Sequence, residues 1–101
     1  MRRVVVTVLG IVSSIGNNTQ EVLASLREAK SGIGPSDKYA ELGFRCHVHG
    51  APKLDPASVI DRRKMRFLAD GSAWAYIAAE QAIQDSGLEP NEVSHELTGL
   101  V

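Results

Sequence analysis

The chain opens with a continuous apolar run followed by a polar segment that contains glycine. Residues 4–9 read Val-Val-Val-Thr-Val-Leu, a pattern typical of a strand covered on both faces of a parallel sheet. We therefore expect a strand from Val4 to Leu9. Residues 10–18 then combine two glycines, two serines and two asparagines, and this composition indicates a loop.

A first helix is expected over residues 19–31. Asn18 is a favourable N-cap, and Glu21 follows at the spacing of a reciprocal cap. Gly32 comes just after the periodic segment, so we expect it to end the helix in the left-handed conformation. The apolar side chains that recur at helical spacing are Val22, Leu23, Leu26 and Ala29.

Residues 32–58 have a weaker pattern. Residues 34–37, Gly-Pro-Ser-Asp, predict a loop. A short, half-exposed strand that ends at Gly50 is predicted next, because apolar and polar positions alternate there. Asp55 followed by Pro56 resembles an N-cap with proline at the first helical position, and so predicts a short helical start. The apolar members of the alternation are Phe44, Cys46 and Val48.

The longest predicted element is a helix from about Ile60 to Ser86. Six alanines between positions 67 and 86 favour helix and allow close packing against a neighbour. Gly87 is suited to the left-handed position after the helix, and Pro90 prevents its continuation. Residues 97–101 begin another apolar run, which we expect to be the start of a strand.

The order strand, loop, helix, irregular excursion, long helix and strand start indicates an α/β layered architecture. A single complete strand cannot form a sheet, because sheets need several strands. We therefore expect residues 1–101 to be the N-terminal segment of a larger domain rather than a complete one.

Charge is distributed unevenly along the chain. All 11 basic residues lie within residues 1–66, whereas residues 67–101 carry only acids. Four of the basic residues fall within five positions with no acid between them: Arg62, Arg63, Lys64 and Arg66. The residues alone leave two interpretations open, a solvated helix face or a weak, salt-sensitive contact with an acidic partner. The acidic C-terminal part argues against nucleic acid as that partner.

Several other classes of function find little support. No apolar run reaches the roughly 18 residues that span a membrane. The loop 10–18 has glycines six positions apart and matches neither phosphate-binding glycine motif. Cys46, His47 and His49 are too few for a closed zinc site, so no metal or other cofactor is expected. A lone cysteine fits a reducing compartment, and we expect a cytoplasmic protein.

The sequence resembles the N-terminus of the β-ketoacyl-[acyl-carrier-protein] synthases, most closely synthase I. Val4 to Asn18 carries the clearest similarity, and the resemblance continues in order over the whole chain. Val8 is a departure, because the family usually has glycine there, and residues 35–43 match only loosely. The further matching stretches are 21–28, 31–33, 53–55, 60–62, 66–67, 80–83 and 86–88.

The resemblance implies a thiolase-like αβαβα fold, a homodimeric enzyme and a decarboxylating Claisen condensation on acyl and malonyl thioesters of acyl-carrier protein. The family's nucleophilic cysteine and two histidines match no position of this chain. Cys46, His47 and His49 lie outside those motifs. We therefore expect no catalytic residue here, and we expect these 101 residues to be inactive alone.

The resemblance does assign a carrier-protein contact to this segment. The family's basic residues near the long helix align with Arg62, Arg63 and Arg66, and Lys64 is an addition at a position that is often apolar in the family. Acyl-carrier protein is acidic, so the resemblance and the charge pattern agree. The alternative is a non-catalytic module that binds carrier protein or pairs with a full synthase. A nucleotide-binding α/β domain is the third interpretation.

Overall fold

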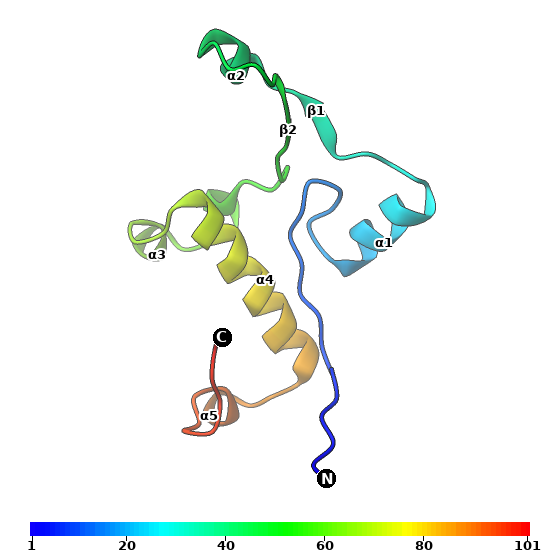
Figure 1. The fold of residues 1–101 in the computed structure, drawn as a ribbon. Coiled ribbons are helices and arrows are strands. Elements are labelled where there is room, and N and C mark those ends of the chain that lie inside the picture. The colour runs from blue at the N-terminus through cyan, green and yellow to red at the C-terminus, as the bar shows by residue number, and fades with distance from the viewer.

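Helix α4 (Asp70–Ser86) is the axis along which the rest of the chain is arranged (Figure 1). The computed structural model describes residues 1–101. The N-terminal segment runs beside α4, and an arm of two short strands projects away from it. The remaining elements, in chain order, are α1 (Thr19–Arg27), β1 (Ile33–Pro35), α2 (Asp37–Glu41), β2 (Val48–Gly50), the 3₁₀ turn η1 (Pro56–Ser58), α3 (Arg62–Met65) and α5 (Pro90–Val93).

The predicted strand from Val4 to Leu9 is wrong for this structure. The segment is extended but belongs to no sheet, and Val4 and Val6 are about nine-tenths exposed. A strand is defined by hydrogen bonds to a neighbour, and none of the other strands lies against this segment. The predicted strand start at 97–101 is likewise absent, for the same reason.

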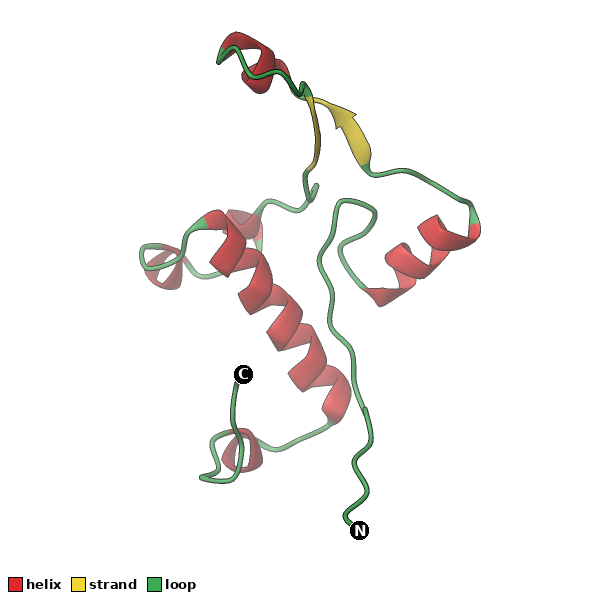
Figure 2. Cartoon of the chain, in the orientation of Figure 1, coloured by secondary structure: helices red, strands yellow, loops and turns green.

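The only sheet is the antiparallel pair β1–β2 in the projecting arm, as Figure 2 shows. Its register places Ile33 opposite Gly50 and Pro35 opposite Val48. The loop predicted at 34–37 is therefore wrong, because part of it is β1 and the rest begins α2. The predicted alternating strand is confirmed only at its end, since β2 begins at Val48.

Helix α1 forms as expected at its start but ends earlier than predicted. Asn18 Oδ1 accepts a hydrogen bond from Glu21 N at 3.0 Å. The helix ends at Arg27, and Ala29 rather than Gly32 takes the left-handed conformation, with φ of 54°. Lys30 N donates to Ser25 O at 2.8 Å, which closes a Schellman turn around Ala29. Gly32 instead lies where a Cβ would be 2.5 Å from Ser14 Oγ.

The long helix predicted from Ile60 to Ser86 is divided into α3 and α4. Ala69, between the two helices, is extended with ψ of 163°. Met65 and Leu68, which lie at the end of α3 and in this turn, pack against the core. The predicted caps before and after this region are confirmed. Asp55 caps η1, and Gly87 has φ of 67° after α4.

The core is small and lies where η1, α3 and α4 meet. Its buried apolar residues are Ile60, Ala73 and Ile77, and only six of the 101 residues are buried. The radius of gyration is 16.9 Å, against about 13 Å for a compact chain of this size. The structure is thus a mixed helical chain with a small two-stranded sheet and much exposed apolar surface. None of its helices is both long and apolar enough to cross a membrane.

Candidate protein-docking surface

Helix α3 presents the cluster of basic residues. The helix follows η1 closely, and its N-cap is Asp61, whose Oδ1 accepts a hydrogen bond from Arg63 N at 2.9 Å. Met65 N donates to Asp61 O at 3.0 Å and closes the single turn. A helix this short has little intrinsic stability, so its contacts with the rest of the chain decide its orientation.

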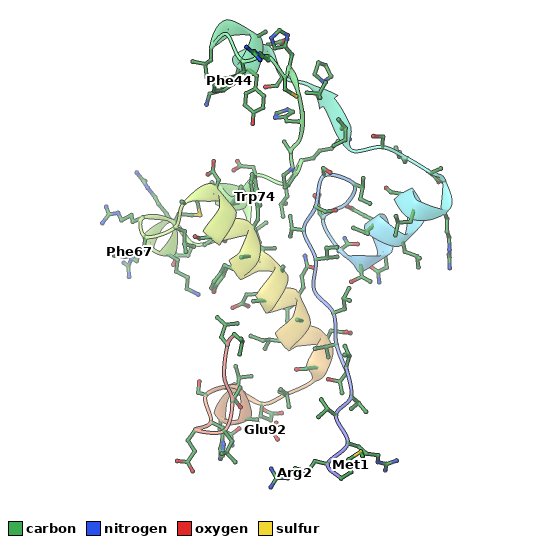
Figure 3. The ribbon with its side chains drawn as sticks, viewed as in Figure 1. Met1, Arg2, Phe44, Phe67, Trp74 and Glu92 are labelled. Carbon is green, nitrogen blue, oxygen red and sulfur yellow. The ribbon has the colours of Figure 1, made fainter.

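Arg62, Arg63 and Arg66 are exposed and lie together on α3 and at its C-cap. Figure 3 shows nitrogen-tipped side chains that project from this part of the molecule, beside Phe67, at an outer edge away from the body of α4. Phe67 is 87% exposed. The structure therefore brings the three predicted arginines to one protruding surface, which we call the arginine surface.

Lys64 is oriented differently from the three arginines. Its Nζ donates a hydrogen bond to Tyr76 Oη at 2.7 Å, and the same nitrogen lies 5.2 Å from the centroid of the Tyr76 ring. The hydrogen bond to Tyr76 is the main cause that raises the pKa of Lys64 above its ordinary value. The negative charges of Glu80 and Asp61 raise this pKa further. Lys64 is exposed, and its charged head group reaches α4 through this surface hydrogen bond.

Sequence reasoning did not identify Tyr76 as part of this region. It lies 12 positions from Lys64. In one continuous helix, residues 12 apart would be separated by about 18 Å along the axis. Only the turn between α3 and α4 brings the two side chains together, so no periodicity in the sequence could have revealed the contact.

A hollow of about 550 Å³ lies beside this contact, between α4 and the segment from Val59 to Lys64. Lys64, Tyr76 and Glu80 line it together with apolar side chains such as Leu54 and Ile77. The hollow adjoins the arginine surface from the α4 side. Neither a cysteine nor a histidine lines it, so it holds no cysteine–histidine pair.

The residues considered for metal binding lie in the arm, remote from α3 along the chain. Cys46 is an exposed free thiol that contacts Val48 O at 3.6 Å. The His49 ring stacks edge-on against Tyr39, with ring centroids 5.4 Å apart. No three side chains of the histidine, cysteine, aspartate and glutamate types converge in the structure.

A hydrogen-bonded loop lies beside α4, on the side of the N-terminal segment. Gln81 Oε1 accepts from Ile11 N at 3.1 Å, and Gln81 Nε2 donates to Asn17 O at 2.7 Å. Gly10 approaches α4 so closely that a Cβ would be 2.8 Å from Ala82 N. Gln81 thus fixes both ends of the loop 10–18 to the same helix that carries Tyr76.

Comparison with known proteins places the chain in a family. Residues 1–101 match the profile of the β-ketoacyl synthase N-terminal domain. The 3-oxoacyl-[acyl-carrier-protein] synthase 1 of Haemophilus influenzae is 50% identical over 101 residues, and that of Escherichia coli K12 is 57% identical over 90 residues. These alignments cover 100% and 89% of this chain but 25% and 22% of the relatives.

A more distant match is the 3-oxoacyl-[acyl-carrier-protein] synthase 2 of Coxiella burnetii, 35% identical over 100 residues, or 98% of this chain and 24% of the relative. The identity to the synthases named 1 is therefore higher than to this synthase named 2, as the sequence resemblance indicated. The chain spans about a quarter of the length of the curated relatives it matches. By the match of its entire length to the family profile, the chain belongs to the β-ketoacyl synthase family.

Proposed function

We propose that this chain is the N-terminal segment of a β-ketoacyl-[acyl-carrier-protein] synthase and that it supplies part of the surface on which acyl-carrier protein docks. The complete enzyme elongates acyl chains by decarboxylating Claisen condensation of an acyl thioester with malonyl-acyl-carrier protein. The single observation that carries this proposal is the family match over all 101 residues. The arginine surface supports the docking role because it is exposed and no acid falls between Arg62 and Arg66.

The docking contact is electrostatic. Arg62, Arg63 and Arg66 face an acidic carrier protein, and each exposed ion pair contributes about 0.2–1 kcal/mol. Three such pairs contribute about 0.6–3 kcal/mol, which corresponds to a change of about 3- to 150-fold in affinity. Contacts of this strength suit a partner that must arrive and leave in every catalytic cycle, because steering by charge mainly increases the association rate.

The condensation chemistry belongs to other parts of the complete enzyme. In this segment Cys46 is exposed in the arm, and its contact is with a carbonyl oxygen rather than with a base. A catalytic thiol needs a group that lowers its pKa or removes its proton. Cys46, His47 and His49 therefore have no catalytic role in the proposal, and the isolated segment is inactive.

The exposed apolar run at Val4–Leu9 fits the same proposal. Val4, Val5 and Val6 are among the most exposed large apolar groups of the chain, and the backbone of the run is extended and unpaired. In the complete enzyme this segment joins a sheet layer of a thiolase-like αβαβα fold. A homodimeric, cytoplasmic enzyme is part of the same proposal.

The test is charge reversal in the complete synthase. We expect the triple variant Arg62→Glu, Arg63→Glu, Arg66→Glu to raise the KM for acyl-carrier protein by at least the roughly 3-fold lower bound above. Arg27→Glu is the matched control, because Arg27 is an exposed cation in the last turn of α1, outside the arginine surface. An unchanged KM in the triple variant would remove the arginine surface from the mechanism.

A further inference from the structure

We propose that Lys64 and Tyr76 form a pair that positions α3, and that Lys64 acts through this pair rather than by touching the docking partner. The inference rests on the proposed function, because it concerns how the arginine surface is presented to acyl-carrier protein. It assigns to Lys64 a positioning role that differs from the direct contact expected from the sequence, and it adds Tyr76 to the docking apparatus.

Helical geometry separates Lys64 from Arg62 and Arg66. Successive residues of an α-helix are rotated by about 100°, so Arg62 and Arg66, four positions apart, project from nearly the same face. Lys64 is two positions from each of them, which rotates it by about 200° from Arg62. It therefore projects from the opposite face, toward α4, where its Nζ meets Tyr76 Oη at 2.7 Å.

The short length of α3 makes this contact important. A four-residue helix cannot maintain its own orientation, so α3 depends on side chains that reach the rest of the chain. Met65 provides an apolar contact with the core, and the pair Lys64–Tyr76 provides a polar one with α4. These two contacts come from adjacent residues and together define how α3 rotates relative to α4.

The chemistry of the pair supports a directional contact. The Lys64 ammonium donates to the phenol oxygen and also lies 5.2 Å from the ring centroid of the same residue. Tyr76 is half-buried, which limits the orientation of its ring and so gives the flexible lysine side chain a well-placed partner. Tyr76 itself, and then Glu80 and Asp61, raise the pKa of Lys64, so the ammonium is charged at any working pH. Asp61 also caps α3, and this places its charge at the start of the same turn.

A double-mutant cycle in the complete synthase separates positioning from direct contact. The variants are Lys64→Met, which removes the ammonium, Tyr76→Phe, which removes only the phenol oxygen, and their combination. We expect each single variant to raise the KM for acyl-carrier protein about two- to fivefold with kcat unchanged. We expect the double variant to raise it no further, because both changes break one contact.

Tyr76→Phe is the decisive variant because it alters no charge and leaves the arginines intact. An effect on KM without an effect on kcat is a readout that general destabilisation does not produce. Ser25→Ala is the matched control. It removes the hydrogen bond from Ser25 Oγ to Ile15 O, 2.6 Å long, in a part of the chain that does not touch α3. Faster amide exchange at Met65 in Tyr76→Phe and Lys64→Met, but not in Ser25→Ala, is also expected.

Two results would overturn the inference while the proposed function survives. One is a normal KM in Tyr76→Phe. The other is a Lys64→Met variant that raises the KM by the same factor whether Tyr76 is intact or already replaced. Such additivity would mean that Lys64 contacts the partner independently of Tyr76. If the triple arginine variant also has an unchanged KM, the proposed docking function itself fails, and the positioning role fails with it.

Discussion

Removing the Gln81 side chain is the perturbation whose effect the structure specifies most closely. This one side chain accepts from Ile11 N at 3.1 Å and donates to Asn17 O at 2.7 Å, so it joins residues 64 and 70 positions away to α4. Gln81→Leu keeps the approximate size and removes both bonds. Each is worth about 0.5–1.5 kcal/mol, so the loop loses about 1–3 kcal/mol of local stability.

Local stability of this kind is measured by amide hydrogen exchange. We expect the Ile11 amide to exchange about 5- to 150-fold faster in the Gln81→Leu form of the complete synthase, since each 1.4 kcal/mol is a factor of ten. Gln81→Glu retains an acceptor for Ile11 but loses the donor to Asn17, so its effect is smaller. Gln84→Leu is the matched control, an exposed glutamine about one turn along the same helix.

Equal exchange at Ile11 in the Gln81→Leu form and the unaltered protein would refute the reasoning. It would mean that the loop is held by its backbone packing alone, chiefly by the close approach of Gly10 to α4. Faster exchange in Gln84→Leu as well would mean that the effect comes from α4 as a whole, and the two hydrogen bonds would lose their special role.

Three further predictions concern individual contacts and the site of catalysis. Ala29→Gly should stabilise the protein by up to about 1 kcal/mol, because Ala29 has φ of 54° and glycine adopts this conformation without strain. Thermal unfolding measures this effect, and a lower melting temperature would contradict it. Folding raises the pKa of Lys64, so its contact with Tyr76 contributes to the free energy of unfolding at all pH values below the usual lysine pKa, and this contribution is lost as pH rises through the raised value. An NMR titration should give Lys64 a higher pKa in the unaltered protein than in the Tyr76→Phe form, and equal values would contradict the contact. The isolated 101 residues should show no condensation and no malonyl decarboxylation, so turnover that survives purification would contradict the placement of catalysis elsewhere.

Local capping signals were the most successful part of the sequence-based predictions. Asn18, Asp55 and Gly87 each have the predicted role, because a cap depends on residues only two to four positions away. The end of α1 was mispredicted because glycine is the usual residue for a left-handed C′ position, and Ala29 takes that position at a small steric cost. Gly32 is instead required by its close approach to Ser14.

The errors concern features that depend on residues distant in the sequence. Residues 4–9 have the composition of a strand, but strand formation needs a hydrogen-bonding neighbour that composition does not supply. Residues with high helix propensity lie on both sides of the α3–α4 turn, in α3 and in the alanine-rich α4, so propensity alone could not locate the turn at Ala69. The turn brings Met65 and Leu68 against core residues that are distant in the sequence, such as Ile77.

The clustering of basic residues at the candidate site was predictable from the sequence. Counting basic residues identified Arg62, Arg63, Lys64 and Arg66, and the structure leaves the three arginines exposed on α3 and at its C-cap. The orientation of Lys64 toward Tyr76 was not predictable, because it depends on the angle between two helices that the sequence pattern joined into one.

The central claim is that these residues form the opening segment of a condensing enzyme whose catalytic groups lie elsewhere. The most direct measurement is the mass of the native product in its source cells, by immunoblot and mass spectrometry. The account predicts a species several times the 10.9 kDa of this chain that contains its peptides. A native species of 10.9 kDa would contradict the account and favour the non-catalytic module that binds carrier protein or pairs with a full synthase.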